Sequence, residues 1–176
     1  MAERETISIK PDTSQLKGLY AAFKDLSDAA NNELKDQVSA ISQWTAGEVK
    51  QAASMAQYMP AQASRVAETV RFSRDRVPNF TVGGSKKNFS GGAKAGEVLY
   101  GSEFGAVPYL SRRVNGSNKG ANTFGKNGGQ RFPPRSPAMG NGSEGYWIYP
   151  TLRAKQNEIT ERWTAAVDHI IRYWKD

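Results

Sequence analysis

The most constraining feature of this 176-residue sequence is a glycine-rich interval in its second half. Fifteen of the 17 glycines lie between positions 83 and 145, and residues 106–145 show almost no apolar periodicity. A structureless connection of that length is uncommon inside a compact domain and is normally functional or disordered. A chain of this length suits one domain with one appendage. We therefore predict a single domain over residues 1–176 that carries residues 106–145 as a long basic, Gly-rich loop or arm.

Strand and helix patterns occupy the first third of the chain. Residues 6–10 alternate polar with β-branched apolar side chains, which predicts a short strand. A capping-box pattern opens residues 12–26, where apolar positions recur at helical spacing. A longer helix is expected over residues 31–57. Met59-Pro60 should end it, because the residue before a proline avoids the helical region.

Further strands and one helix are predicted in the rest of the chain. β-branched and aromatic residues between 66 and 82 suggest strands, and residues 97–100 suggest another. The aromatic run at 146–149 favours core packing, with an interface as the alternative. A last helix follows Pro150, and one of its faces carries Leu152, Ile159, Trp163, Val167, Ile170 and Trp174. The expected fold is α+β, a small antiparallel sheet packed against the long central helix and the C-terminal helix.

Composition excludes several classes of function. Cysteine is absent and His169 is the single histidine, so thiol nucleophiles, thiolate zinc sites and multi-histidine metal sites are excluded. We expect no metal and no cofactor. The longest apolar runs fall short of the ~18 residues of a membrane span, and the first residues lack a signal-peptide core. The sequence predicts a soluble protein of a reducing compartment, with no membrane partner.

Two partial motifs for catalysis fail on inspection. Residues 120–127 match the spacing of a phosphate-binding loop, but Asn127 stands where Ser or Thr would hold magnesium, and no strand precedes the motif. Residues 142–145 resemble a nucleophile elbow that lacks its first glycine. Glu97 and Glu103 could be imagined as an acid/base pair, but we expect ordinary solvated carboxylates. We also expect His169 to be a surface or boundary residue, and therefore predict no catalytic residues and no enzyme activity.

The positive charge of the chain is concentrated in its middle. Residues 60–135 hold 13 Lys and Arg against four Asp and Glu, whereas the remaining residues hold 11 against 13. Segregated charge of this kind indicates contact with a polyanion or an acidic partner. The candidate contact residues are Lys86, Lys87, Lys94, Arg112, Arg113, Lys119, Lys126, Arg131 and Arg135.

Three aromatic residues lie among these basic positions, at Phe89, Phe124 and Phe132. They could stack on the bases of a single strand or anchor the arm on a neighbouring subunit. A third reading is an insertion without a ligand, which could still become ordered when a partner supplies the burial that it lacks.

Two local motifs resemble those of one protein family. Residues 98–106 resemble the aromatic-x-x-Glu-Phe-Gly segment of the tail-completion (minor tail-component) proteins of long-tailed bacteriophages. Residues 149–159 resemble the Pro-x-Leu-x-x-Ala stretch that opens that family's C-terminal helix, and the order of the elements is similar over nearly the whole chain. The matching positions, which the resemblance implies are structural or subunit-contacting, are Tyr100, Glu103, Phe104, Gly105, Tyr149, Pro150 and Leu152.

The resemblance implies a structural role in the neck of the virion. Family members form a ring between the head-side connector and the tail tube, so the implied partners are copies of this chain in a hexameric ring and the adjacent head-closure, connector, tail-terminator or tail-tube proteins. Non-specific contact with packaged DNA is a further expectation, because a cationic loop can follow phosphates without reading bases. Assembly would take place in the cytoplasm of the host bacterium.

Three alternatives remain open on the sequence. The motifs do not separate a tail-completion protein from a tail terminator or a head-closure protein, and a small DNA-binding accessory protein would also need a basic loop. The long Arg/Gly insertion and residues 61–64, where the family has a Thr-Gly type of turn, depart from the family pattern. The role of the insertion therefore does not follow from the resemblance.

Overall fold

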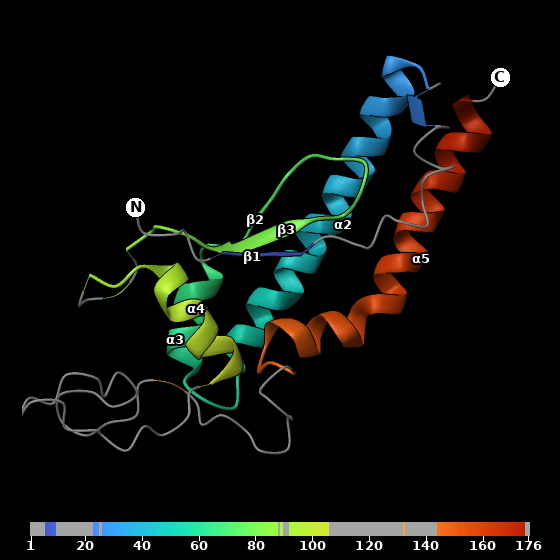
Figure 1. The fold of residues 1–176 in the computed structure, drawn as a ribbon. Coiled ribbons are helices and arrows are strands. Elements are labelled where there is room, and N and C mark those ends of the chain that lie inside the picture. Colours follow the sequence, from blue (N-terminus) through green and yellow to red (C-terminus); the bar gives the residue numbers. More distant parts are fainter. Residues whose placement is uncertain are drawn as a thin grey trace, which may run out of the picture.

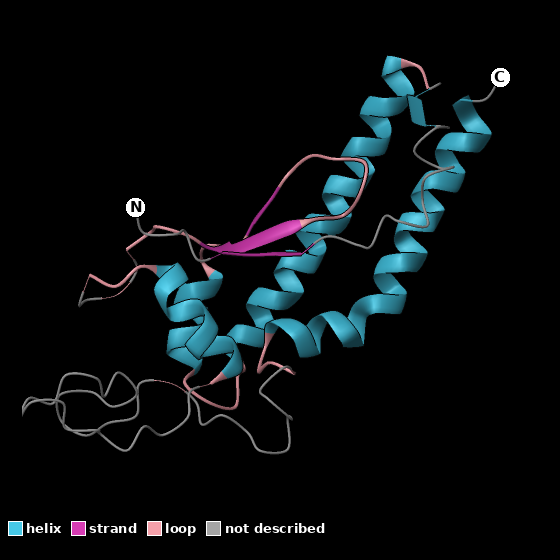
Figure 2. Cartoon of the chain, viewed as in Figure 1, coloured by secondary structure: helices cyan, strands magenta, loops and turns pink. Residues whose placement is uncertain are grey.

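The computed structural model describes residues 6–9, 23–24, 26–87, 89, 92–105, 132 and 144–174. Figure 1 shows their arrangement, and Figure 2 shows that helices make up most of it. In chain order the elements are β1 (Thr6–Ile9), α2 (Asp28–Ser54), α3 (Pro60–Ala67), β2 (Arg71–Phe72), β3 (Phe80–Gly83), α4 (Ala95–Phe104) and α5 (Ile148–Trp174).

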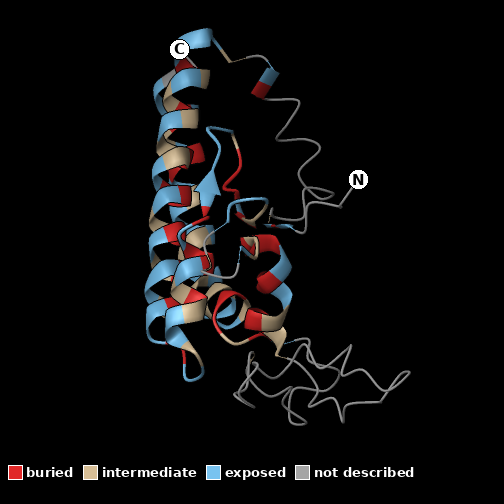
Figure 3. Cartoon of the chain, turned by 90° about the vertical axis from the view of Figure 1, so that its left-hand side faces the viewer, coloured by how far each residue is buried: buried red, intermediate tan, exposed pale blue. Residues whose placement is uncertain are grey.

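The longest elements, α2 and α5, lie side by side and run in opposite directions (Figure 1). The N-cap of α2 is Ser27, whose side chain accepts a hydrogen bond from the Ala30 N–H at 3.2 Å. Buried positions then recur three or four residues apart along the helix, as expected for an apolar stripe. Figure 3 shows buried residues alternating with exposed ones along the helices. At the end near the start of α2, the two helices share a small core of Phe23, Ala30, Leu34, Val38, Val167 and Ile170.

The three strands form an antiparallel sheet in the order β1-β3-β2. Ile7 pairs with Val82, and Ile9 pairs with Phe80. Because side chains alternate along a strand, this register places apolar residues on one face, while Thr6, Ser8 and Thr81 are exposed.

A second and larger core joins the sheet to the helices. Ile7, Phe80 and Val82 of the sheet share it with Ala46 and Val49 of α2. Residues of α3 and α4 and the start of α5 complete it, namely Ala63, Val66, Ala67, Val98, Leu99, Trp147 and Ile148. The α+β arrangement predicted from the sequence, with a small antiparallel sheet, a long central helix and a C-terminal helix, is confirmed.

Two predicted strand segments are helical instead. Residues 97–100 belong to α4, and Val66 belongs to α3. Short apolar runs do not separate a strand from a buried helix by pattern alone. Burial of Val98 and Leu99 in the larger core favours the helix, and α4 gains a cap because Glu97 Oε2 accepts a hydrogen bond from the Lys94 N–H at 2.9 Å. Phe72 and residues 80–82 are in strands, as predicted, whereas Val70 and Val77 are buried outside the strands.

Helix boundaries also differ from the prediction, and α2 begins at Asp28 rather than at residue 31. Helix α2 ends at Ser54 rather than at residue 57, and Pro60 begins α3 instead of only ending the preceding helix. A proline suits the first helical position because no N–H is needed there. Helix α5 begins at Ile148, two residues before Pro150.

The face predicted for α5 points inward over most of its length. Val167 and Ile170 are buried, and Leu152, Ile159 and Trp163 are half-buried. The side chain of Trp174 lies outside the described residues, as does most of the helix expected over 12–26.

Candidate functional site

A buried carboxylate connects the two segments that carry the family resemblance. Glu103, in the last turn of α4, has no exposed surface and reaches the start of α5. Its Oε2 accepts hydrogen bonds from the N–H groups of Trp147 at 3.2 Å and Ile148 at 2.8 Å. Its Oε1 accepts a third, from the Tyr149 N–H at 2.9 Å. We call this set of contacts the Glu103 clasp.

The clasp satisfies donors that a helix leaves unpaired. The first N–H groups of an α-helix have no partner within the helix, and the positive end of the helix dipole favours an anion there. The capping group is normally a side chain next to the helix in the sequence. Here it stands 44 to 46 residues earlier, on a different helix.

Gly145 provides the space that the carboxylate occupies. Its φ of +72° lies in the left-handed region, and a Cβ at this position would collide with Glu103 Oε1. Gly105, which follows α4, also has a positive φ of 71°. Glycine adopts such values without the steric cost that other residues meet.

Burial changes the pKa of the Glu103 carboxyl group. Desolvation raises the pKa of Glu103 above its ordinary value, and the backbone N–H groups of residues 146–149 offset part of this increase. The prediction of an ordinary solvated carboxylate at Glu103 is therefore wrong. No acid/base pair with Glu97 is formed, because Glu97 caps α4 while Glu103 is bound to the backbone of α5.

Aromatic rings surround the clasp on both sides. The Tyr100 ring stacks on Phe104 with centroids 6.2 Å apart, and Phe104 contacts Tyr149 at 5.6 Å. Tyr58 meets Tyr146 edge-on at 5.4 Å. Tyr100 is 47% exposed, whereas Phe104 and Tyr149 are half-buried against the larger core. Among the residues that match the family motif, Tyr100 is therefore the aromatic that a neighbouring molecule could reach.

The remaining motif positions support the start of α5. Pro150 is exposed in its first turn, where the missing N–H of proline costs no helical hydrogen bond. Leu152 is half-buried and packs on the larger core. The structure thus brings all seven motif residues together at the junction of α4 and α5.

The structure describes three of the nine Lys and Arg residues predicted as contact residues. Lys87 and Lys94 face each other in an isolated antiparallel bridge, and Lys94 lies 3.7 Å from Glu97. Lys86 instead lines a groove beside α2 and α3. Arg112, Arg113, Lys119, Lys126, Arg131 and Arg135 lie outside the described residues.

Three residues of the arm are described, namely Phe132, Glu144 and Gly145, and Phe132 lies against the body. The ring of Phe132 occupies the space beside Gly101 where a Cβ would otherwise be, and it packs on the larger core. Phe132 therefore packs within its own chain, which is neither of the two roles predicted for it, base stacking or anchoring on a neighbouring subunit. No feature of the sequence showed that Gly101 would receive it.

The described residues hold few groups arranged for chemistry. His169 is half-buried, with its Nε2 3.1 Å from Glu33 Oε1, which agrees with a boundary residue. Within the described ranges no cluster of three or more His, Cys, Asp or Glu side chains could hold a metal ion. Over the same ranges, no helix is both long and apolar enough to cross a membrane. The two partial motifs at 120–127 and 142–145 fall largely outside the described residues.

Comparison with known proteins adds no assignment, because no protein family, no curated protein and no solved structure matches this chain.

Proposed function

We propose that this chain is a structural protein of the neck of a long-tailed bacteriophage, a tail-completion protein that joins the tail to the head connector as one subunit of a ring. The single observation that carries the proposal is the Glu103 clasp. The two segments that resemble the family lie more than 40 residues apart in the sequence, yet Glu103 of the first accepts a hydrogen bond from the N–H of Tyr149, the first residue of the second. Two further hydrogen bonds, from Trp147 and Ile148, fix Glu103 to the residues just before that segment. This contact between the two segments supports the proposal.

The clasp also suits a protein that works through an arm. Gly105 and Gly145, at the two ends of the arm, are held next to each other because Glu103 binds the backbone just beyond Gly145. An arm whose two ends meet at the clasp, and whose Phe132 packs on the body, can engage a neighbouring subunit through its other residues without distorting the core. Closed rings arise from such head-to-tail contacts, in which each subunit offers two different surfaces.

Removal of the gene from its phage tests the proposal. We expect filled heads and separate tails in electron micrographs, with infectivity restored by the full-length chain supplied in trans. A tagged chain should be visible at the junction below the capsid. Intact infectious particles without the protein would contradict a role in the neck.

A DNA-binding accessory protein is the second candidate, and the Lys87–Lys94 bridge favours it. The bridge places two lysines next to each other, and Lys94 already lies 3.7 Å from Glu97, so Lys87 is the one of the two that forms no ion pair with a described residue and could attract an anionic ligand. If this function is the correct one, the purified monomer will bind duplex DNA tightly, and its affinity will fall steeply with salt concentration. Gel-shift titrations at several salt concentrations distinguish it from a neck protein.

A further inference from the structure

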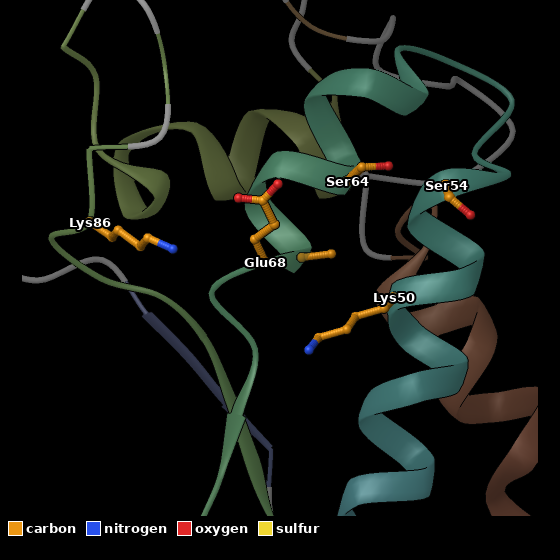
Figure 4. Close-up of a pocket in the computed structure, with 6 residues that line it drawn as sticks. Lys50, Ser54, Ser64, Glu68 and Lys86 are labelled. Atoms are coloured by element: carbon orange, nitrogen blue, oxygen red, sulfur yellow. The ribbon is translucent and has the colours of Figure 1, made fainter.

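A groove on the body lies between the last turns of α2, helix α3 and the loop after β3. Its volume is about 460 Å³, and its walls are formed by Lys50, Ser54, Ser64, Ala67, Glu68 and Lys86. Figure 4 shows Lys50 and Lys86 extending into it from opposite sides, with Glu68 between them.

The charges in this groove have no partners among the residues that the structure describes. Lys50, Lys86 and Glu68 are exposed, and none of them forms an ion pair there. Some other cations of the body do form ion pairs, since Arg74 pairs with Asp36 and Lys155 pairs with Glu48. Lys50 and Lys86 come from segments far apart in the sequence, so the fold brings two ammonium groups without an ion pair, and the single carboxylate of Glu68, to one cavity.

The turn that joins α2 to α3 adds apolar surface at the end of the same two helices. Met55 directly follows the groove residue Ser54 and is 74% exposed, and Tyr58 is 39% exposed. Met59 adopts φ +50°, which is uncommon for a residue other than glycine. Strained backbone of this kind is concentrated at functional sites, and exposed methionine is typical of adaptable binding surfaces.

We propose that this groove and the adjoining turn bind an acidic segment of a partner protein, with one carboxylate on Lys50 and another on Lys86, on either side of Glu68, and an apolar side chain on Met55. Complementary charge favours the carboxylates. Glu68 makes DNA a poor occupant of the groove, because its carboxylate would repel the repeated phosphate charges. A peptide can instead place a neutral residue next to Glu68. The inference rests on the proposed function only in its choice of partner, a neighbouring protein of the neck.

The test uses the full-length chain and a fluorescein-labelled peptide in which glutamate alternates with leucine. Acylation of lysines, read by mass spectrometry with and without the peptide, reports where it binds. We expect protection of Lys50 and Lys86, with Lys35 on α2 as the internal control because it also forms no ion pair with a described residue.

Variants give the second measurement by fluorescence anisotropy. Lys50→Glu and Lys86→Glu should each weaken peptide binding at least tenfold, Met55→Ala severalfold, and Lys35→Glu less than twofold. Glu68→Gln should tighten binding, because it removes a repulsive charge from the groove. Circular dichroism confirms that each variant is folded.

Two outcomes would overturn the proposal. One is protection of Lys50 and Lys86 no greater than that of Lys35. The other is stronger protection of these two lysines by duplex DNA than by the peptide, which would assign the groove to nucleic acid. Both are measured on the purified chain, so failure here is distinguishable from failure of the neck assignment, which is read in particles.

Discussion

The two cores of this protein are built in different ways. At the far end of the α2–α5 pair, apolar residues of two long helices pack together with Phe23 of a short helical segment. At the other end, residues of the sheet and of four helices share one core, and a buried carboxylate crosses between two of those helices. The first core consists of apolar side chains, and the polar contact between His169 and Glu33 lies beside it in a half-buried position. The second depends in addition on a few polar contacts whose loss leaves buried backbone donors without partners.

The largest effect is expected from Glu103→Ala, which removes the clasp. Three N–H groups at the start of α5 lose their acceptor, and unsatisfied buried donors cost about 1–3 kcal/mol each without being fully additive. We expect the free energy of unfolding to fall by about 3–5 kcal/mol. Urea unfolding followed by circular dichroism measures it.

A matched change at the same place identifies the cause. Gly145→Ala keeps the carboxylate but fills its space at a positive φ, so it should destabilise the protein by roughly 2 kcal/mol or more. Hydrogen exchange should increase at residues 146–149 in both variants. If exchange increases equally at the far end of α2, the two cores unfold together and the comparison fails.

Leu34→Ala tests the apolar core in the same way. Leu34 is fully buried, and truncation of such a residue costs about 2–4 kcal/mol through lost burial and a remaining cavity. We expect the amides of α2 around position 34 to exchange faster, while those at the clasp keep their protection. If Leu34→Ala increased hydrogen exchange at residues 146–149 as strongly as Glu103→Ala does, the effect of Leu34→Ala would not be local.

A smaller effect is expected at the N-cap of α2. Ser27→Ala removes the acceptor of the Ala30 N–H, and loss of such a cap costs about 1 kcal/mol. Ser27→Asp should retain most of the stability, because a carboxylate also caps and suits the helix dipole. Thermal unfolding of the wild type, Ser27→Ala and Ser27→Asp ranks their stabilities. A Ser27→Ala variant as stable as the wild type would contradict the role of this cap.

The smallest expected effect is the pH dependence of stability that the buried carboxyl group of Glu103 causes. The pKa of Glu103 is raised in the folded protein, so the folded state holds this proton more tightly than the unfolded chain does. That contribution is fully present below the ordinary glutamate pKa and is lost as pH rises through the raised value. The stability of the wild type relative to Glu103→Gln should therefore decrease as pH rises from about 4 to 7. Urea titrations across this range check it, and a difference that grows with pH would contradict the sign.

The sequence predicted the parts of the fold that depend on local pattern. Alternation gave the strand at residues 6–9, and helical spacing gave the bodies of α2 and α5. Helix α3 was missed because Val66 has a strand-forming side chain, although the core buries it within a helix. Residues 97–100 were assigned wrongly for the same reason.

The site was predictable only in part. The family resemblance selected Glu103 and the start of α5 separately, but no spacing rule connects a carboxylate to N–H groups more than 40 residues later. Lys50 was not predicted as a site residue, because its sequence context is that of an ordinary exposed helix position. Only the fold shows that it shares a groove with Lys86.

The position of the clasp has a consequence for how this chain can be altered. Both ends of the intervening stretch are fixed by bonds that do not involve it, and the entropy of closing a loop grows only with the logarithm of its length. Sequences of different size could therefore replace the segments on either side of Phe132, between Gly105 and Gly145, while the rest of the protein keeps its geometry, provided that Phe132 keeps its place beside Gly101. The junction of α4 and α5 can therefore accept inserts of different length.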